Sequence, residues 1–255
     1  MTEQLFNLDA YFERIQYTGK RTVSAETLKQ LHTAHVMRIP FENLDIFHKK
    51  NISLEREDLF NKIVLNHRGG YCFEMNGLFS AVLEEMGYQV TNHLARVYRN
   101  GFENSGKTHM VLLVEVDQKT WVCDVGFGGN GLTAPILLEE GLEQEHFLRT
   151  HRIMRDDDYG YRLEFKIADQ FQPIYAFTLE KCCPADYLIA NHYTATYPGS
   201  FFTQLMMCAI VTEVGKITFL DGQLKITAGD NQTEEMIVGD MAIKKTLKAY
   251  FGLQL

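Results

Sequence analysis

The spacing of apolar residues changes along this chain near Gly87, and this change constrains the fold more than any other feature of the sequence. Before Gly87 the apolar residues recur at three- and four-residue steps, as on the buried face of a helix. After it they alternate with polar residues in short runs, which is typical of strands. We therefore expect an α+β protein in which a helical N-terminal part precedes a sheet or barrel.

The expected elements follow from these two patterns. Helices should begin at Asn7, at Ser24 and at Ser53 as N-cap, and a fourth should run from Cys72 until Gly87 stops it. Asp221-Gly222 predicts a hairpin turn, Pro184 opens a later helix, and residues 241–251 form the last one. The expected strands are 90–98, 109–116, 121–125, 161–167, 173–179, 205–214, 216–220 and 224–228.

Charge and composition narrow the possible partners. The 255 residues carry a formal net charge of −8 without any run of Lys or Arg, which argues against a nucleic-acid partner but leaves an anionic cofactor possible. The N-terminus lacks a basic and apolar leader, and no segment approaches the ~18 apolar residues that cross a bilayer. A cytoplasmic protein without a membrane partner is expected.

The five cysteines form no CxxC pair, so they indicate neither a disulfide framework nor a zinc site. Cys182 and Cys183 are interpreted as packing residues. Cys72 differs because Gly69 and Gly70 precede it and a helix follows it. In the first helical turn, free backbone N–H groups and the helix dipole favour a thiolate. The two glycines are expected to adopt backbone angles closed to other residues and to let a substrate approach. We therefore interpret Cys72 as a nucleophile, although a buried inert thiol is commoner.

A cysteine nucleophile needs a base, and the base needs an orienting group. His109 opens one expected strand, and Asp124 lies in the next among apolar residues, where an unpaired carboxylate would be costly. A hairpin turning at residues 118–119 puts both side chains on one face but places Asp124 opposite Leu113. Leu113 lies four residues from His109 along the strand, so Asp124 would be displaced from His109 by about 13 Å. An earlier turn, a bulge or strong coiling is needed to bring the pair together.

Other polar features carry weaker signals. His32 and His35 lie three apart on a helix, but no third ligand is evident, so they are interpreted as solvated side chains and no metal is expected. His151 and His192 have no evident partner. Residues 125–130 contain three glycines, and their N–H groups would suit a phosphate or a pantetheine chain, although a plain turn fits equally well.

Several segments together resemble the arylamine N-acetyltransferases: residues 39–44, 68–76 and 124–129, with His109, and in the later part Asn191, Tyr193, Pro198, Ser200 and Phe202. The resemblance implies a helical domain over residues 1–87, a β-barrel domain over 88–195 and an α/β lid over 196–255. It also implies a catalytic core like that of the cysteine proteases.

The resemblance further implies a role for each site residue. Cys72 would carry an acetyl group from acetyl-CoA, with His109 as its base and Asp124 as the orienting acid, and an aromatic amine or hydrazine would then attack the thioester in a ping-pong reaction. Glu42 and Arg68 would form a supporting pair. The acceptor would contact Phe41, Thr108 and Phe127. The CoA region would comprise Ser105, Gly128, Gly129, Ser200 and Thr203.

Three alternatives remain open at this point. Cys72, His109 and Asp124 would also serve a thiol hydrolase or transglutaminase-like enzyme, or a biosynthetic amide synthase that takes a bulkier acyl group. A binding module without catalysis is the third. The identity of the acyl donor separates the enzymes, and loss of turnover on replacing Cys72 separates them all from the binding module.

Overall fold

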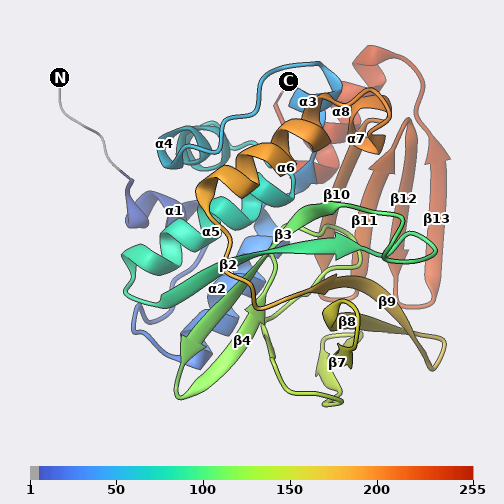
Figure 1. The fold of residues 1–255 in the computed structure, drawn as a ribbon. Helices are drawn as coiled ribbons and strands as arrows, with labels where there is room; N and C mark the ends of the chain where they lie inside the picture. The colour runs from blue at the N-terminus through green and yellow to red at the C-terminus, as the bar shows by residue number, and fades with distance from the viewer. Residues whose placement is uncertain (1–5, 255) are drawn as a thin grey trace.

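The computed structural model describes residues 6–254. Helices dominate the N-terminal part, and the last of them, α5, lies against the sheet that follows (Figure 1). Its apolar residues pack with those of α1, α2 and α4 into the largest core cluster. The N-terminal elements are α1 (Leu8–Arg14), α2 (Ala25–Arg38), α3 (Leu44–Phe47), α4 (Arg56–Phe60), a π-helical turn (Asn61–Leu65) and α5 (Cys72–Glu85).

An antiparallel sheet of eight strands follows in the order β5-β4-β3-β2-β9-β8-β7-β6, coiled into a nearly closed barrel (Figure 1). A second apolar cluster, which includes Val111, Val122 and Tyr175, fills its inside. The strands are β2 (Gln89–Val97), β3 (Lys107–Val116), β4 (Lys119–Cys123), β5 (Ile136–Leu137), β6 (Gln144–His146), β7 (Arg149–Asp156), β8 (Gly160–Ile167) and β9 (Gln170–Phe177).

A second sheet, of five strands in the order β1-β10-β11-β12-β13, is formed mostly by the C-terminal part of the chain. Its edge strand β1 (Phe41–Glu42) comes from the helical part and pairs with β10, so that Phe41 lies opposite Ala209. Helix α6 runs across the front of the view in Figure 1. The remaining elements are α6 (Pro184–Thr196), α7 (Phe201–Gln204), β10 (Met207–Thr212), β11 (Gly215–Leu220), β12 (Gln223–Ala228), β13 (Asn231–Met236) and α8 (Asp240–Phe251).

The α+β class and the barrel expected from the sequence are confirmed, and several boundaries differ. The helix predicted to be capped by Ser53 begins at Arg56, because the Ser53 hydroxyl instead accepts from the backbone N–H of Glu55 at 3.2 Å. The strand predicted over 205–214 is shorter, since α7 ends at Gln204. The domain limits at residues 87 and 195 stay predictions.

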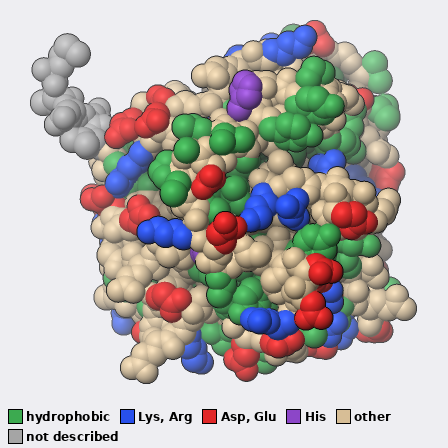
Figure 2. All heavy atoms as spheres, in the orientation of Figure 1, with side chains coloured by type: hydrophobic (Ala, Val, Ile, Leu, Met, Phe, Trp, Pro, Cys, Tyr) green, Lys and Arg blue, Asp and Glu red, His purple; other side chains and the backbone are tan. Residues whose placement is uncertain are grey.

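Acidic and basic side chains are interspersed on the face that Figure 2 shows, with small apolar patches between them. Both signs of charge therefore lie within reach of any ligand that binds this face. Within residues 6–254, no helix combines the length and apolar character that a bilayer crossing requires.

Candidate active site

Cys72 is the first residue of α5, as the sequence predicts, and its side chain is buried. The backbone N–H of Tyr71, at the N-cap, donates to the Glu74 carboxylate at 3.1 Å, which satisfies one end group of the helix. The Cys72 thiol lies 3.8 Å from the carbonyl oxygen of Thr108, at the start of β3. The helix start therefore holds the sulfur against the barrel.

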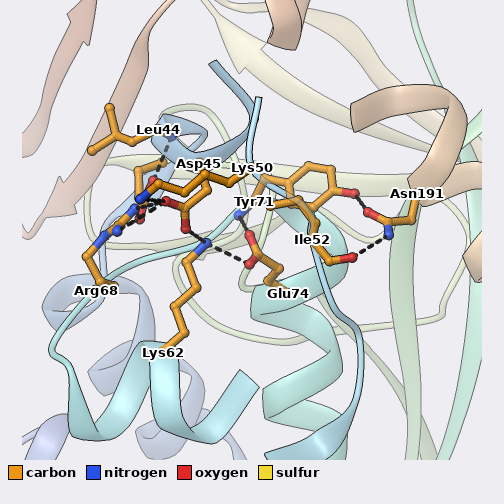
Figure 3. A network of polar contacts seen from close by, with 10 residues as sticks. Leu44, Asp45, Lys50, Ile52, Lys62, Arg68, Tyr71, Glu74 and Asn191 are labelled. Carbon is orange, nitrogen blue, oxygen red and sulfur yellow. Dashed lines mark hydrogen bonds and ion pairs between the residues drawn. The ribbon is translucent and has the colours of Figure 1, made fainter. Parts of the chain in front are cut away.

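A network of ion pairs lies at this helix start (Figure 3). Lys62 bonds Glu74 at 2.7 Å and Asp45 at 2.8 Å, and Arg68 bonds Asp45 and the buried Glu42, the latter at 2.7 Å. Burial raises the pKa of Glu74 to about 7 although Lys62 opposes the shift. The Glu42–Arg68 pair expected from the sequence is present. Buried charges of this kind are tolerated because every member has a partner.

The two glycines before Cys72 have a different role from the one expected. Neither Gly69 nor Gly70 has a positive φ, so the prediction of special backbone angles is wrong. A Cβ atom at Gly69 would lie 2.0 Å from the carbonyl oxygen of Pro40, and one at Gly70 would lie 2.8 Å from Cβ of Glu74. The glycines are required because the backbone packs closely against its neighbours.

His109 and Asp124 meet because the β3–β4 hairpin turns one residue earlier than predicted. The turn is formed by Asp117 and Gln118, with φ angles of 53° and 59°, as a two-residue hairpin turn requires. Cys123 then lies opposite Leu112, so Asp124 falls two residues closer to His109 along β3. Nε2 of His109 lies 2.7 Å from Oδ2 of Asp124.

The charges in this pair stabilise each other away from water. Burial by itself lowers the pKa of His109, but the Asp124 carboxylate outweighs it and, with a smaller effect of Cys72, raises that pKa to about 10. Burial raises the pKa of Asp124, whereas His109, Asn76 and the N–H of Gly126 together hold it below its usual value. Because Nε2 of His109 is bonded to Asp124, Nδ1 is the nitrogen that remains for the Cys72 sulfur.

Asn76 is a site residue that the sequence reasoning missed. Its amide donates to Oδ1 of Asp124 at 2.9 Å and to the carbonyl of Met110 at 2.8 Å, and its oxygen accepts from the N–H of Val125 at 2.9 Å. Asn76 stands four residues after Cys72 on the same helix face, and this spacing was the signal available in the sequence.

The interpretation of His32 and His35 as solvated residues is wrong, since both side chains are fully buried. Nε2 of His32 accepts from the backbone N–H of Asp124 at 3.1 Å, and Nδ1 of His35 lies 2.8 Å from the hydroxyl of Tyr11. Burial lowers the pKa of His32 to about 4. A neutral imidazole therefore holds the backbone of Asp124. Within residues 6–254, no group of three or more His, Cys, Asp and Glu side chains could hold a metal ion.

Aromatic rings surround the histidine. Phe127 meets the His109 ring edge-on, with ring centroids 5.3 Å apart. The ring of Tyr175, in β9, has its centroid 5.0 Å from that of His109. Phe41 lies beside Gly128, where a Cβ atom would be 3.2 Å from its ring. Gly126 packs on Cys72, since its Cβ would lie 2.8 Å from the Cys72 Cα. The loop after Asp124 thus forms one wall of the site.

The hydroxyl groups assigned to the CoA region from the sequence make local bonds. Ser105 donates to the carbonyl of Val97 at 2.6 Å and Ser200 to that of Thr194 at 2.7 Å. Thr203 donates to the carbonyl of Ser200 at 2.9 Å. A groove of about 480 Å³ adjoins Thr108, and its lining includes Gly106, Lys107, Ala190 and Tyr193. Thr108, whose carbonyl contacts the Cys72 sulfur, is one of its lining residues.

A family model described as N-acetyltransferase matches residues 24–255. The chain is 36% identical over 249 residues to an arylamine N-acetyltransferase of Escherichia coli strain K12, covering 96% of this chain and 88% of that protein. It is similar to the arylamine N-acetyltransferase structure of M. smegmatis, with a TM-score of 0.93, 32% identity, and coverage of 98% and 93%.

The Mycobacterium marinum arylamine N-acetyltransferase, solved in complex with CoA, gives a TM-score of 0.91 at 32% identity, covering 96% of this chain and 92% of that one. These likenesses extend over nearly the whole chain. The chain belongs to the arylamine N-acetyltransferase family and is an acyltransferase.

Proposed function

We propose that this enzyme moves an acetyl group from acetyl-CoA to the nitrogen of arylamines and arylhydrazines through an acetyl group held on Cys72. The observation that carries the proposal is the buried pair of His109 and Asp124, whose Nε2 and Oδ2 atoms lie 2.7 Å apart, beside Cys72, which helps to raise the pKa of His109. A cysteine, a base and an orienting acid are the parts that nucleophilic acyl transfer needs. The CoA complex of the M. marinum relative supports CoA as the carrier of the acyl group.

In the first half-reaction, the Cys72 proton already resides on Nδ1 of His109, because the pKa of that imidazole is raised to about 10, and the thiolate attacks the carbonyl carbon of acetyl-CoA. The carbon–sulfur bond to CoA breaks, and the CoA sulfur receives the proton from His109. Asp124 stabilises the imidazolium until this transfer, because it is buried and bonded to Nε2. The products are acetyl-Cys72 and free CoA.

In the second half-reaction, the amine nitrogen attacks the thioester carbon while Nδ1 of His109 accepts one of its protons. The bond to Cys72 breaks, so the amide leaves and the thiolate is restored beside the imidazolium. An arylamine suits this step because it is largely unprotonated at neutral pH. Both half-reactions use one site, so ping-pong kinetics follow.

The same proposal assigns the walls of the site. Phe41, Phe127 and Thr108 would contact the aromatic acceptor, and this is supported by the edge-on contact of Phe127 with His109 at 5.3 Å. Ser105, Gly128, Gly129, Ser200 and Thr203 would border the CoA molecule, with the groove beside Thr108 as its entrance. A cytoplasmic location belongs to this proposal as well.

Peptide mass spectrometry after incubation with acetyl-CoA tests the proposal. One acetyl group is expected on Cys72 of the reduced protein and none in the Cys72→Ala variant, whereas Cys183→Ala, which removes an exposed thiol, should acetylate normally. Absence of the Cys72 adduct would refute acetyl transfer through this thiol. An adduct that passes to water as fast in the absence of amine as with it would indicate a hydrolase. A marked preference for longer acyl-CoA donors would instead indicate an amide synthase.

A further inference from the structure

Strand β7 presents two buried side chains to the loop that follows Asp124. Nη1 of Arg149 donates to the carbonyls of Gly129 at 2.9 Å and of Gly131 at 3.3 Å, and Nε2 of His151 lies 3.4 Å from the carbonyl oxygen of Asn130. The two residues share a strand face because they are two apart. Three consecutive carbonyls are therefore held by one strand.

Arg149 is also bonded to the C-terminal sheet. Its Nη2 donates to the carbonyl of Gly215 at 3.0 Å, at the turn between β10 and β11. The next residue of β11, Lys216, donates to the side-chain oxygen of Asn130. One guanidinium thus joins the barrel, the loop after Asp124 and the second sheet.

The charge of Arg149 makes this arrangement unusual. The residue is 6% exposed, and burial lowers its pKa to about 10. Within residues 6–254 it has no carboxylate partner, and the nearby Lys216 has the same sign. A buried cation bonded only to carbonyls is costly compared with an apolar side chain, so stability by itself does not account for it. Its planar donors suit several carbonyls at fixed angles.

The carbonyls that Arg149 holds are connected to the reacting groups. The N–H of Gly131 donates to the carbonyl of Gly128 at 2.9 Å, which closes a tight turn. A Cβ atom at Gly131 would lie 2.9 Å from Cβ of Phe127, whose ring meets His109. A shift of this turn would therefore move Phe127 against the histidine.

We propose that Arg149 is a positioning residue that holds the turn over residues 128–131, and with it Phe127, in the place where the acceptor amine binds. The inference rests on the proposed function, in which Phe127 contacts the acceptor. It extends that function by making the acceptor half-reaction, more than acetylation of Cys72, depend on a residue outside the site. The bond to Gly215 makes the β10–β11 turn part of the same support.

The two half-reactions measured separately test this. In Arg149→Met we expect KM for 4-methylaniline to rise about tenfold, because a displacement near 1 Å is enough for such losses. The rate of Cys72 acetylation at saturating acetyl-CoA should stay within about threefold of wild type, since saturation removes any weaker binding of CoA at Gly128 and Gly129. Arg155→Met is the matched control, since Arg155 is an exposed arginine of the same strand that bonds the hydroxyl of Tyr161. An unchanged KM, or equal losses in both half-reactions, would overturn the inference.

Two further measurements separate positioning from general damage. Millimolar guanidinium should lower the raised KM of Arg149→Ala, while the same concentration of methylammonium should not, because the planar donors are what is missing. Amide hydrogen exchange in Arg149→Lys should speed up jointly in residues 126–131 and 213–217 while the rest of the barrel stays protected. Uniform acceleration, or no rescue by guanidinium, would count against the proposal. Failure of wild-type Cys72 to acetylate would refute the proposed function instead.

Discussion

The backbone N–H of Asp124 donates to Nε2 of His32 at 3.1 Å, so a helix of the N-terminal part holds the acid that is hydrogen-bonded to His109. The side chains of His32 and Asp124 are both buried. If His32 were replaced by a residue without an acceptor, a water molecule could take its place only where there is room for one. The hydrogen bond from the Asp124 backbone to His32 therefore helps to hold the Asp124 carboxylate in place.

This bond predicts the effect of changing His32. His32→Leu should lower kcat/KM about tenfold or more, because an unsatisfied buried N–H costs about 1–3 kcal/mol and Asp124 can relieve it by moving. His32→Gln, which keeps an acceptor, should lose less. Steady-state release of CoA thiol measures both, with His48→Leu on the exposed end of α3 as the control. Equal activity of the Leu and Gln variants would argue that the acceptor is irrelevant.

Asp124→Asn should reduce turnover by about three to four orders of magnitude, as loss of an orienting acid does elsewhere. The Asp124 charge is the principal cause that raises the pKa of His109 to about 10 against the effect of burial, so the variant should bring that pKa down. Alkylation of Cys72 by iodoacetamide at pH 6, relative to pH 9, should then slow. Labelling with the same pH dependence in wild type and variant would contradict the proposed pairing.

Arg68→Met should destabilise the protein by about 3–5 kcal/mol, because it leaves the buried carboxylate of Glu42 without its partner. The double variant with Glu42→Gln should lose less than the sum of the two single changes. Urea unfolding at pH 7 gives these values. Lys225→Met breaks an exposed pair with Glu234 and should cost at most about 1 kcal/mol. Strict additivity at Glu42 and Arg68 would show that the pair is not coupled.

Stability should fall as the pH drops from 6.5 toward 4. Burial lowers the pKa of His32 and of His151 from 6.5 to about 4, so in this range the unfolded chain binds protons that the folded protein excludes. Each contributes on the order of 3 kcal/mol. Glu74 acts oppositely between pH 4.5 and 7, because its pKa is raised to about 7. His151→Asn should therefore show a smaller loss of urea resistance between pH 6.5 and 4 than wild type.

The sequence predicted the helix that begins at Cys72 because the apolar period and the glycines before it are local signals. It did not predict β13, whose six residues are all exposed, because an edge strand with no buried face has no alternating pattern. β7 was also missed. Its buried positions include Arg149 and His151, so its inward face is polar in the sequence although it is buried in the fold.

The site was predictable as a set of residue types but not as a geometry. A hairpin shifted by one residue decides whether His109 reaches Asp124, and that depends on the turn at Asp117 and Gln118. The burial of His32 depends on which helix face meets the barrel, which a single helix pattern does not specify. Asn76 carried a usable signal, since its spacing from Cys72 places both on one helix face.

The pairing of β1 with β10 also determines when the site can first form during synthesis. Phe41 and Glu42 leave the ribosome long before Ala209 and Cys208, to which they pair. A nascent chain can fold α5 and the barrel while Phe41, which is bridged to Gly70, still lacks its pairing with β10. The acceptor wall proposed for this enzyme would therefore be the last part of the site to become ordered, only after the second sheet has emerged.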